Sequence, residues 1–196
     1  MRRSENEGLI FSKQGSGTYV RQRINTDSSD LLPLDLPIGT TYSHRDQKIT
    51  SKVLRFDARL PEKSEQENLG IEASSPVYEF KRVRSINDQL YSYEHTIMPV
   101  YIAPLDKKIL QDSVYHYLGT EAKIQLTDAH RTIYAEEASE EASKALEIAK
   151  TSPVLVIEQV AYDQKGRAFE FSKSVFKSSQ SKFILDVHMN SDRISL

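Results

Sequence analysis

The 196-residue chain has no cysteine and no tryptophan, and it contains only seven glycines and seven prolines. Without cysteine there can be no disulfide, no thiol nucleophile and no thiolate ligand for a metal. No apolar run approaches the roughly 18 residues that a membrane-spanning helix requires. The start, Met1–Glu5, lacks the apolar stretch of a signal peptide. The sequence therefore predicts a soluble, cytoplasmic protein with no membrane partner.

Motifs that support catalysis or cofactor binding are also missing. The five histidines are scattered, and no two of them flank a glutamate at the spacing of a zinc site. No serine lies in a Gly-x-Ser-x-Gly turn, and the glycines form neither a phosphate-binding loop nor a dinucleotide-binding pattern. We therefore expect no metal, no cofactor and no enzymatic activity.

Charge is distributed unevenly along the chain. The sequence has 26 basic and 28 acidic residues, so no overall positive field attracts nucleic acid. The first 23 residues, in contrast, contain five basic residues and two acidic ones. Within them, two short apolar runs flank a segment with Gly15 and Gly17, which predicts a β-hairpin. We divide the chain into this basic hairpin (1–23), a polar linker (24–36) and a larger body (37–196).

The body combines strand and helix patterns. Apolar alternation predicts strands at 49–60, 77–85, 90–98, 123–134, 154–162 and 168–177. Helices are expected at 63–69, 104–118 and 136–150. Turn residues at 86–89 and 163–166 would join neighbouring strands into hairpins. Hairpins with interspersed helices predict an α+β fold, with a mainly antiparallel sheet and flanking helices.

Polar residues occur in these strands where apolar ones would be expected. Arg82 and Arg84 lie on the same strand face as two aromatic residues, because side chains alternate between faces. Burying two guanidinium groups is costly unless an anion meets them, and their donors match carboxylate or phosphate geometry. Glu94 and Glu170, on other strands, would meet hydroxyl or amine groups. The pattern favours a pocket for a sugar phosphate or a small acid; alternatively, both arginines face solvent and pair with Glu79 or Glu94.

Several short motifs, taken in order, resemble a known family. Glu7-Gly8-Leu9-Ile10 and residues 14–20 resemble the end of the winged helix-turn-helix of GntR-family bacterial transcription regulators, in which this hairpin is the wing. The body resembles the UTRA ligand-sensing domain of the HutC subgroup, whose fold is related to chorismate lyase. The markers of the body are Arg82 and Arg84, Glu94 before Met98-Pro99, Ser113-Val114-Tyr115, the alanine-rich stretch 136–149 and Ala168-Phe169-Glu170-Phe171-Ser172.

The resemblance implies roles for individual residues. In relatives that sense phosphosugars, it implies that the phosphate is held by Arg82, Arg84, Ser113 and Tyr115, with a hydroxyl from Thr41. Glu94 and Glu170 would contact the sugar. In the wing, the residues expected to contact DNA phosphates are Lys13, Gly15 and Gly17.

The start of the chain departs from the family pattern. The family places three helices before the wing, including the recognition helix that enters the major groove. Few residues precede the hairpin here, so we expect a truncated winged helix-turn-helix and operator binding only by a form with the complete motif. The expected function is effector sensing by a homodimeric regulator whose operator binding changes with a phosphorylated sugar. Two alternatives are a chorismate-lyase-like enzyme and a truncated regulator that acts only by heterodimerisation.

Overall fold

The computed structural model describes residues 10–13, 17–20, 31–33, 47–179 and 181–184. The chain forms two compact units, one from residues 1–35 with 183–196 and the other from residues 36–182. Strands β1 (Ile10–Lys13) and β2 (Gly17–Val20) pair antiparallel, as the predicted hairpin requires. Strand β3 (Leu31–Pro33) pairs with β10 (Lys182–Ile184) in a second two-stranded sheet. The domain boundaries at residues 23 and 36 stay predictions.

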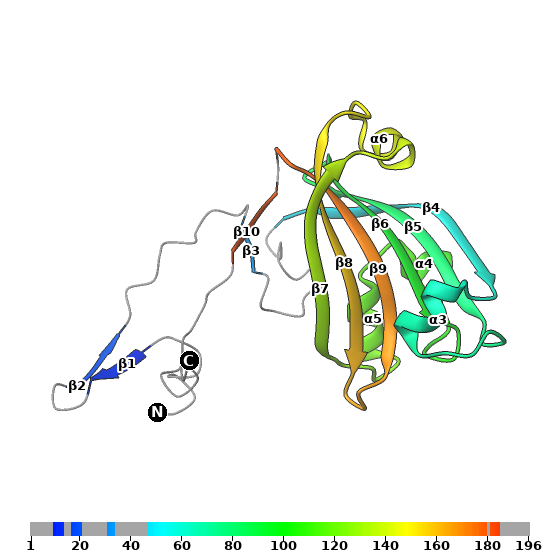
Figure 1. Cartoon of the computed structure of the whole chain (residues 1–196), viewed down its shortest axis with the longest axis horizontal. Coiled ribbons are helices and arrows are strands. Elements are labelled where there is room, and N and C mark those ends of the chain that lie inside the picture. The colour runs from blue at the N-terminus through cyan, green and yellow to red at the C-terminus, as the bar shows by residue number, and fades with distance from the viewer. Residues whose placement is uncertain (1–9, 14–16, 21–30, 34–46, 180, 185–196) are drawn as a thin grey trace. The chain divides into compact units, whose positions relative to one another are not determined.

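A six-stranded antiparallel sheet forms the centre of the larger unit (Figure 1). Its strand order is β4-β5-β6-β9-β8-β7, and each neighbouring pair runs antiparallel. The strands are β4 (Ile49–Arg59), β5 (Val77–Ile86), β6 (Gln89–Pro99), β7 (Leu126–Glu137), β8 (Pro153–Asp163) and β9 (Ala168–Lys177). Each begins and ends within a few residues of a predicted strand, and the α+β fold class is confirmed.

Two tight hairpins order the centre of the sheet. β5 and β6 are joined by Asn87 and Asp88, whose φ angles of 51° and 66° give a turn with two left-handed residues. Such turns match the right-handed twist of the flanking strands, and asparagine and aspartate tolerate this conformation. The β8–β9 turn contains Gly166 at a φ of 71°. Both hairpins are where the sequence predicted them.

Asp163 organises the β8–β9 turn from a fully buried position. Its Oδ1 accepts from the backbone N–H of Lys165 (2.9 Å) and of Arg167 (3.0 Å), and its Oδ2 accepts from the Arg167 guanidinium (2.7 Å). Burial raises the pKa of Asp163, but these hydrogen bonds outweigh it, so the pKa lies below its ordinary value. The ionised carboxylate is therefore the form that stabilises the fold.

Replacing Asp163 with asparagine should lower the free energy of unfolding at pH 7 by about 2 kcal/mol, because the charged acceptor is lost. A group whose pKa is lower in the folded state stabilises the fold above its unfolded-state pKa, and this stabilisation is lost as the pH falls. The difference in unfolding free energy between the parent and Asp163→Asn, the stability gap, should therefore close below about pH 4. Urea unfolding between pH 3 and pH 7 measures this dependence. The control is Asp88→Asn, at an exposed turn position paired with Lys48, and it should change little. A gap that widens toward acid would contradict the prediction.

Two of the three predicted helices, at 63–69 and 136–150, are present in the structure. α3 (Lys63–Leu69) matches its prediction and ends at Gly70, in the left-handed conformation (φ 61°) that glycine adopts readily. α6 (Glu140–Leu146) is shorter than predicted, because β7 continues to Glu137. At its other end Glu147 adopts a left-handed φ of 55° and terminates it.

The prediction of a single helix at 104–118 is wrong. The structure has two short helices there, α4 (Lys107–Leu110) and α5 (Val114–Thr120). At the break, the carbonyls of Leu110 and Asp112 accept hydrogen bonds from Arg82. A continuous helix would use these carbonyls internally, so a contact from a distant strand divides the helix.

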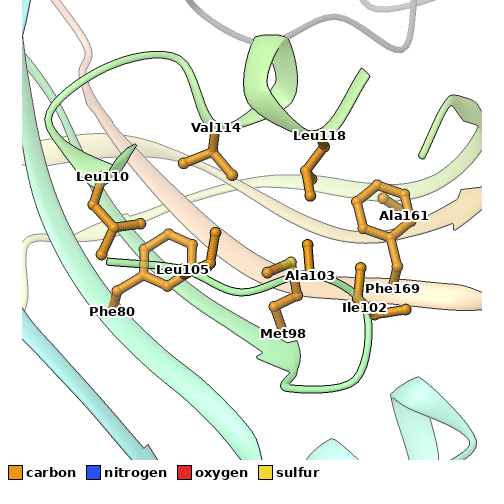
Figure 2. Close-up of a cluster of buried hydrophobic side chains, with 10 residues drawn as sticks. All are labelled: Phe80, Met98, Ile102, Ala103, Leu105, Leu110, Val114, Leu118, Ala161 and Phe169. Carbon is orange, nitrogen blue, oxygen red and sulfur yellow. The ribbon is translucent and has the colours of Figure 1, made fainter. Parts of the chain in front are cut away.

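Apolar side chains pack on both faces of the sheet. On one face, α4 and α5 bring Leu110, Val114 and Leu118 against Phe80 and other buried side chains (Figure 2). On the opposite face, α6 packs on Val83 and Tyr93 of the central strands, and α3 covers a smaller cluster. The face under α4 and α5 also carries the polar residues described next.

Among the described residues, no helix is long and apolar enough to cross a membrane.

Candidate functional site

Buried polar residues form a continuous band across the face of the sheet under α4 and α5. The strand register places Arg82 opposite Glu94, and Arg84 opposite Ser92. Farther along, Ser172 of β9 lies opposite both Thr96 of β6 and Gln159 of β8, which in turn faces Arg131 of β7. Polar side chains buried on this face are Arg82, Arg84, Ser92, Glu94, Thr96, Gln159, Glu170 and Ser172. Strand pairing brings into one layer residues that are up to ninety positions apart in the sequence.

Arg82 is the anchor of one end of this band. Its guanidinium donates to Glu94 Oε2 (2.7 Å) and, through Nη1, to the carbonyls of Leu110 (3.1 Å) and Asp112 (3.3 Å). The group also lies 5.5 Å from the centre of the Phe80 ring, in cation–π contact. Its Nε is buried and has no hydrogen-bond partner among the described residues. Arg82 thus holds α4 and α5 against the sheet while one donor stays unused.

Arg84 adds a second buried positive charge to the same face. The residue is only 4% exposed, and Arg82 is 6% exposed. Burial lowers the pKa of Arg84, while the negative charge of Glu94 is the main opposing influence. The Ser92 hydroxyl, across from Arg84, is buried with no hydrogen-bond partner in the described part of the chain. This end of the band therefore combines two buried guanidinium groups with the Glu94 carboxylate and the Ser92 hydroxyl.

Glu170 is the centre of the other end of the band. Its Oε1 accepts from Tyr115 Oη (2.8 Å), Ser172 Oγ (2.8 Å) and Gln159 Nε2 (3.3 Å). Burial raises the pKa of Glu170, and the hydrogen bonds from Ser172 and Tyr115 act in the opposite direction. Burial also raises the pKa of Tyr115, with a further contribution from the charge of Glu170. Tyr115 therefore stays a neutral hydroxyl.

A hollow of about 330 Å³ lies at the outer edge of the sheet, between β4 and α4. Ser51 and Val53, which line it, are the strand partners of Arg84 and Arg82. Gln111, another lining residue, lies between the two residues whose carbonyls Arg82 binds. Basic side chains around the hollow are Lys52, Arg55 and Lys107. The hollow is thus positively lined and adjoins the arginine end of the band.

The structure brings together most of the residues singled out in the sequence. Arg82 and Glu94 form one bonded pair, and Tyr115 and Glu170 form another. The alternative in which Arg82 and Arg84 face solvent is wrong, because both are buried. The pairing of Arg82 with Glu94 that it included is confirmed. The binding roles of these residues stay predictions.

The five remaining predicted residues are not part of this band as the structure describes it. Ser113 is half-buried at the N-terminus of α5, where its hydroxyl accepts from the His116 N–H (3.3 Å). Thr41 and Gly15 lie outside the described residues. Lys13 and Gly17 face each other as strand partners in the β1–β2 hairpin, and their contact with DNA stays a prediction.

Sequence reasoning missed Gln159 and Arg131. Gln159 lies on β8 opposite Ser172, and Arg131 lies on β7 opposite Gln159. Gln159 bonds directly to Tyr115 and Glu170. The signal was available in part, because Gln159 is a polar residue among alternating apolar ones in a predicted strand. Its face could have been assigned from the register of the β8–β9 hairpin.

Comparison with known proteins agrees with this architecture. Residues 44–182 match the UTRA domain family. The transcriptional regulator YydK of Bacillus subtilis is 31% identical over 94% of this chain and 77% of its own length. MngR, the mannosyl-D-glycerate transport/metabolism system repressor of Escherichia coli, is 30% identical over 98% of this chain and 80% of its own length. The crystal structure of YydK superposes with a TM-score of 0.81 and 28% identity, covering 95% of this chain and 79% of that one.

Fold and sequence together define the class as transcription regulators with a UTRA domain. The chain belongs to the UTRA domain family, within the GntR-type regulators. The relatives named above are transcription regulators.

Proposed function

We propose that this chain senses a small anionic metabolite, a sugar phosphate, and that the band on the α4/α5 face is its effector site. The proposal is carried by the buried pair Arg82 and Arg84. Glu94 pairs with Arg82, and Glu170 lies at the far end of the band. A phosphate would add negative charge beside the two guanidinium groups and match the geometry of their donors.

Two buried groups support an additional ligand at the arginine end. Arg82 Nε and Ser92 Oγ lack partners among the described residues, although buried polar groups in proteins are nearly always hydrogen-bonded. A phosphate oxygen between the two arginines would accept from such donors. Ser113 and Thr41 remain proposed phosphate contacts, on the family resemblance. The hollow beside β4 has basic lining residues, lies next to this end through the strand partners of both arginines, and would attract an anion toward it.

The other end of the band supports a sugar. Glu170, Gln159, Ser172 and Tyr115 supply the carboxyl, amide and hydroxyl groups with which proteins bind sugar hydroxyls. The family resemblance assigns Tyr115 to the phosphate, and we propose the sugar end for it instead because its hydroxyl bonds to Glu170. The name of MngR links that relative to mannosyl-D-glycerate, which favours a sugar-related ligand for this site as well. Glu94 lies between the two ends and can contact either part of the ligand.

The regulatory part of the proposal is thermodynamic linkage. The chain acts as a homodimer, and the effector binds one dimer geometry more tightly than another, which shifts the equilibrium between them. The linker at 24–36 carries this change toward the wing. Operator binding belongs to a form with the complete winged helix-turn-helix, because a wing contacts phosphates but does not read base sequence.

Replacing Arg84 with glutamine should weaken the binding of glucose 6-phosphate about 100-fold, since a buried charge partner of the phosphate is removed. Calorimetric titration with glucose 6-phosphate, glucosamine 6-phosphate and inorganic phosphate measures the change. The matched control, Lys165→Gln, removes a positive charge from the exposed β8–β9 turn and should bind like the parent. The proposal fails if the parent binds nothing across a broad phosphate panel, or if both variants bind equally well.

A further inference from the structure

A chain of hydrogen bonds connects strand β7 with the Glu170 end of the site. Arg131 Nε donates to Gln159 Oε1 (2.7 Å). The Gln159 amide nitrogen then donates to Tyr115 Oη (2.9 Å), and Tyr115 Oη donates to Glu170 Oε1 (2.8 Å). Four side chains from β7, β8, α5 and β9 thus form one bonded series that ends at the carboxyl group.

Arg131, the first residue of this series, determines which group donates and which accepts in each of its hydrogen bonds. A guanidinium group has donors only, so the Gln159 carbonyl oxygen must face Arg131. The amide NH₂ then points toward Tyr115 and can only donate. The Tyr115 oxygen accepts this bond, and its own hydrogen is directed to Glu170. Without Arg131 the amide could rotate by half a turn, and its carbonyl would face the site instead.

The same arrangement determines what Glu170 offers to a ligand. Among the described residues, the hydrogen bonds found for this carboxyl group all reach Oε1, from Tyr115, Ser172 and Gln159. The hydrogen bonds to Oε1 oppose the effect of burial, which raises the pKa of Glu170. In the ionised group Oε2 carries acceptor capacity, and the hydrogen bonds given above do not use it. The hydrogens of both hydroxyls are already used for this carboxylate, so they cannot be given to a ligand without breaking these bonds.

We propose that Arg131, acting through Gln159, makes the Glu170 end of the site an acceptor, so that the ligand group bound there is a hydrogen-bond donor. This inference rests on the proposed function, and it narrows the ligand class: opposite its anionic group, the effector carries a hydroxyl or an ammonium. A carboxylate at this position would meet Glu170 with no donor between the two oxygens and would be rejected. Arg131 and Gln159 are positioning residues in this arrangement, and Glu170 contacts the ligand.

The test compares two probes that share a phosphate and differ at the opposite end. Glucose 6-phosphate presents hydroxyls there, whereas 6-phosphogluconate presents a carboxylate. For the full chain we expect glucose 6-phosphate to bind more tightly than 6-phosphogluconate. In Arg131→Leu the ratio of the two affinities should fall about tenfold. The Gln159 amide is then free to rotate, so it no longer has to donate its hydrogen bond to Tyr115. The affinity for inorganic phosphate should stay within about twofold, since the arginine end is unchanged.

Two further variants separate positioning from general structural support. Arg131→Lys keeps a group that only donates, so it should restore the preference. Gln159→Leu removes the amide and should lose the preference as Arg131→Leu does, with thermal unfolding as a check on folding in each case. If Arg131→Leu and Gln159→Leu both bind phosphate and both keep the parent's preference for glucose 6-phosphate over 6-phosphogluconate, this inference is overturned. If the parent binds neither phosphate ester nor inorganic phosphate, the proposed function fails, and this inference fails with it.

Discussion

Replacing Arg82 with methionine should lower the free energy of unfolding by about 3–5 kcal/mol, the largest loss we expect from a charged residue of this chain. Methionine keeps much of the volume of the arginine stem, but it leaves the Glu94 carboxylate buried beside no cation. The carbonyls of Leu110 and Asp112 also lose their donor. Both effects act on the same group of contacts, so they should appear as one cooperative loss in urea unfolding monitored by circular dichroism.

A double variant tests the cause of this loss. Arg82→Met combined with Glu94→Met removes both charges, so it should recover a large part of the stability, because well-packed apolar residues can replace a buried ion pair. Neither single variant should bind glucose 6-phosphate with the affinity of the parent. An Arg82→Met protein within about 1 kcal/mol of the parent would show that Glu94 is well solvated or otherwise compensated.

Replacing Phe80 with alanine should cost about 3–5 kcal/mol, through lost burial and the cavity that remains. Phe80 is 1% exposed and packs under Leu110 of α4, and its ring supports the Arg82 guanidinium. The cavity would therefore open directly below the α4–α5 break (Figure 2). Urea unfolding gives the stability change, and calorimetry with glucose 6-phosphate reports on the site.

Two comparisons make this result specific to the core position. Phe80→Leu keeps an apolar side chain and should lose roughly 1 kcal/mol. Tyr101→Ala removes an aromatic ring that is 57% exposed and should stay within about 0.5 kcal/mol of the parent. A Phe80→Ala protein as stable as Phe80→Leu would mean that α4 and α5 collapse into the space, and that the interface between helices and sheet is pliable.

The strands could be predicted from the sequence because their signals are local. Alternation along 77–86 shows which side chains share a face, and the Asn87-Asp88 pair fixes the register of β5 and β6. Local patterns also placed Arg82, Arg84, Glu94 and Glu170 on strands of the same sheet. That Arg82 bonds to Glu94 follows from the register, since the two are directly opposed.

The errors come from contacts between distant parts of the chain. Periodicity predicted one helix over 104–118, but it cannot register that Arg82, more than twenty residues earlier, binds two of its carbonyls. Gln159 and Arg131 were missed for a related reason. Their place in the site depends on the pairing of β8 with β9 and of β7 with β8, which no single strand reveals.

The outer strands of the sheet also have a consequence for solution behaviour. In the described part of the chain, β4 and β7 are the terminal strands, so one row of backbone N–H and C=O groups on each lacks a neighbouring strand. Such rows are templates on which unrelated chains can stack into aggregates. On β4 the register shift between Val53 and Arg55 interrupts the row, and β7 carries charged side chains such as Asp128 and Glu137 along its length. Irregularity on one border and charge on the other protect the protein from polymerising through its own sheet.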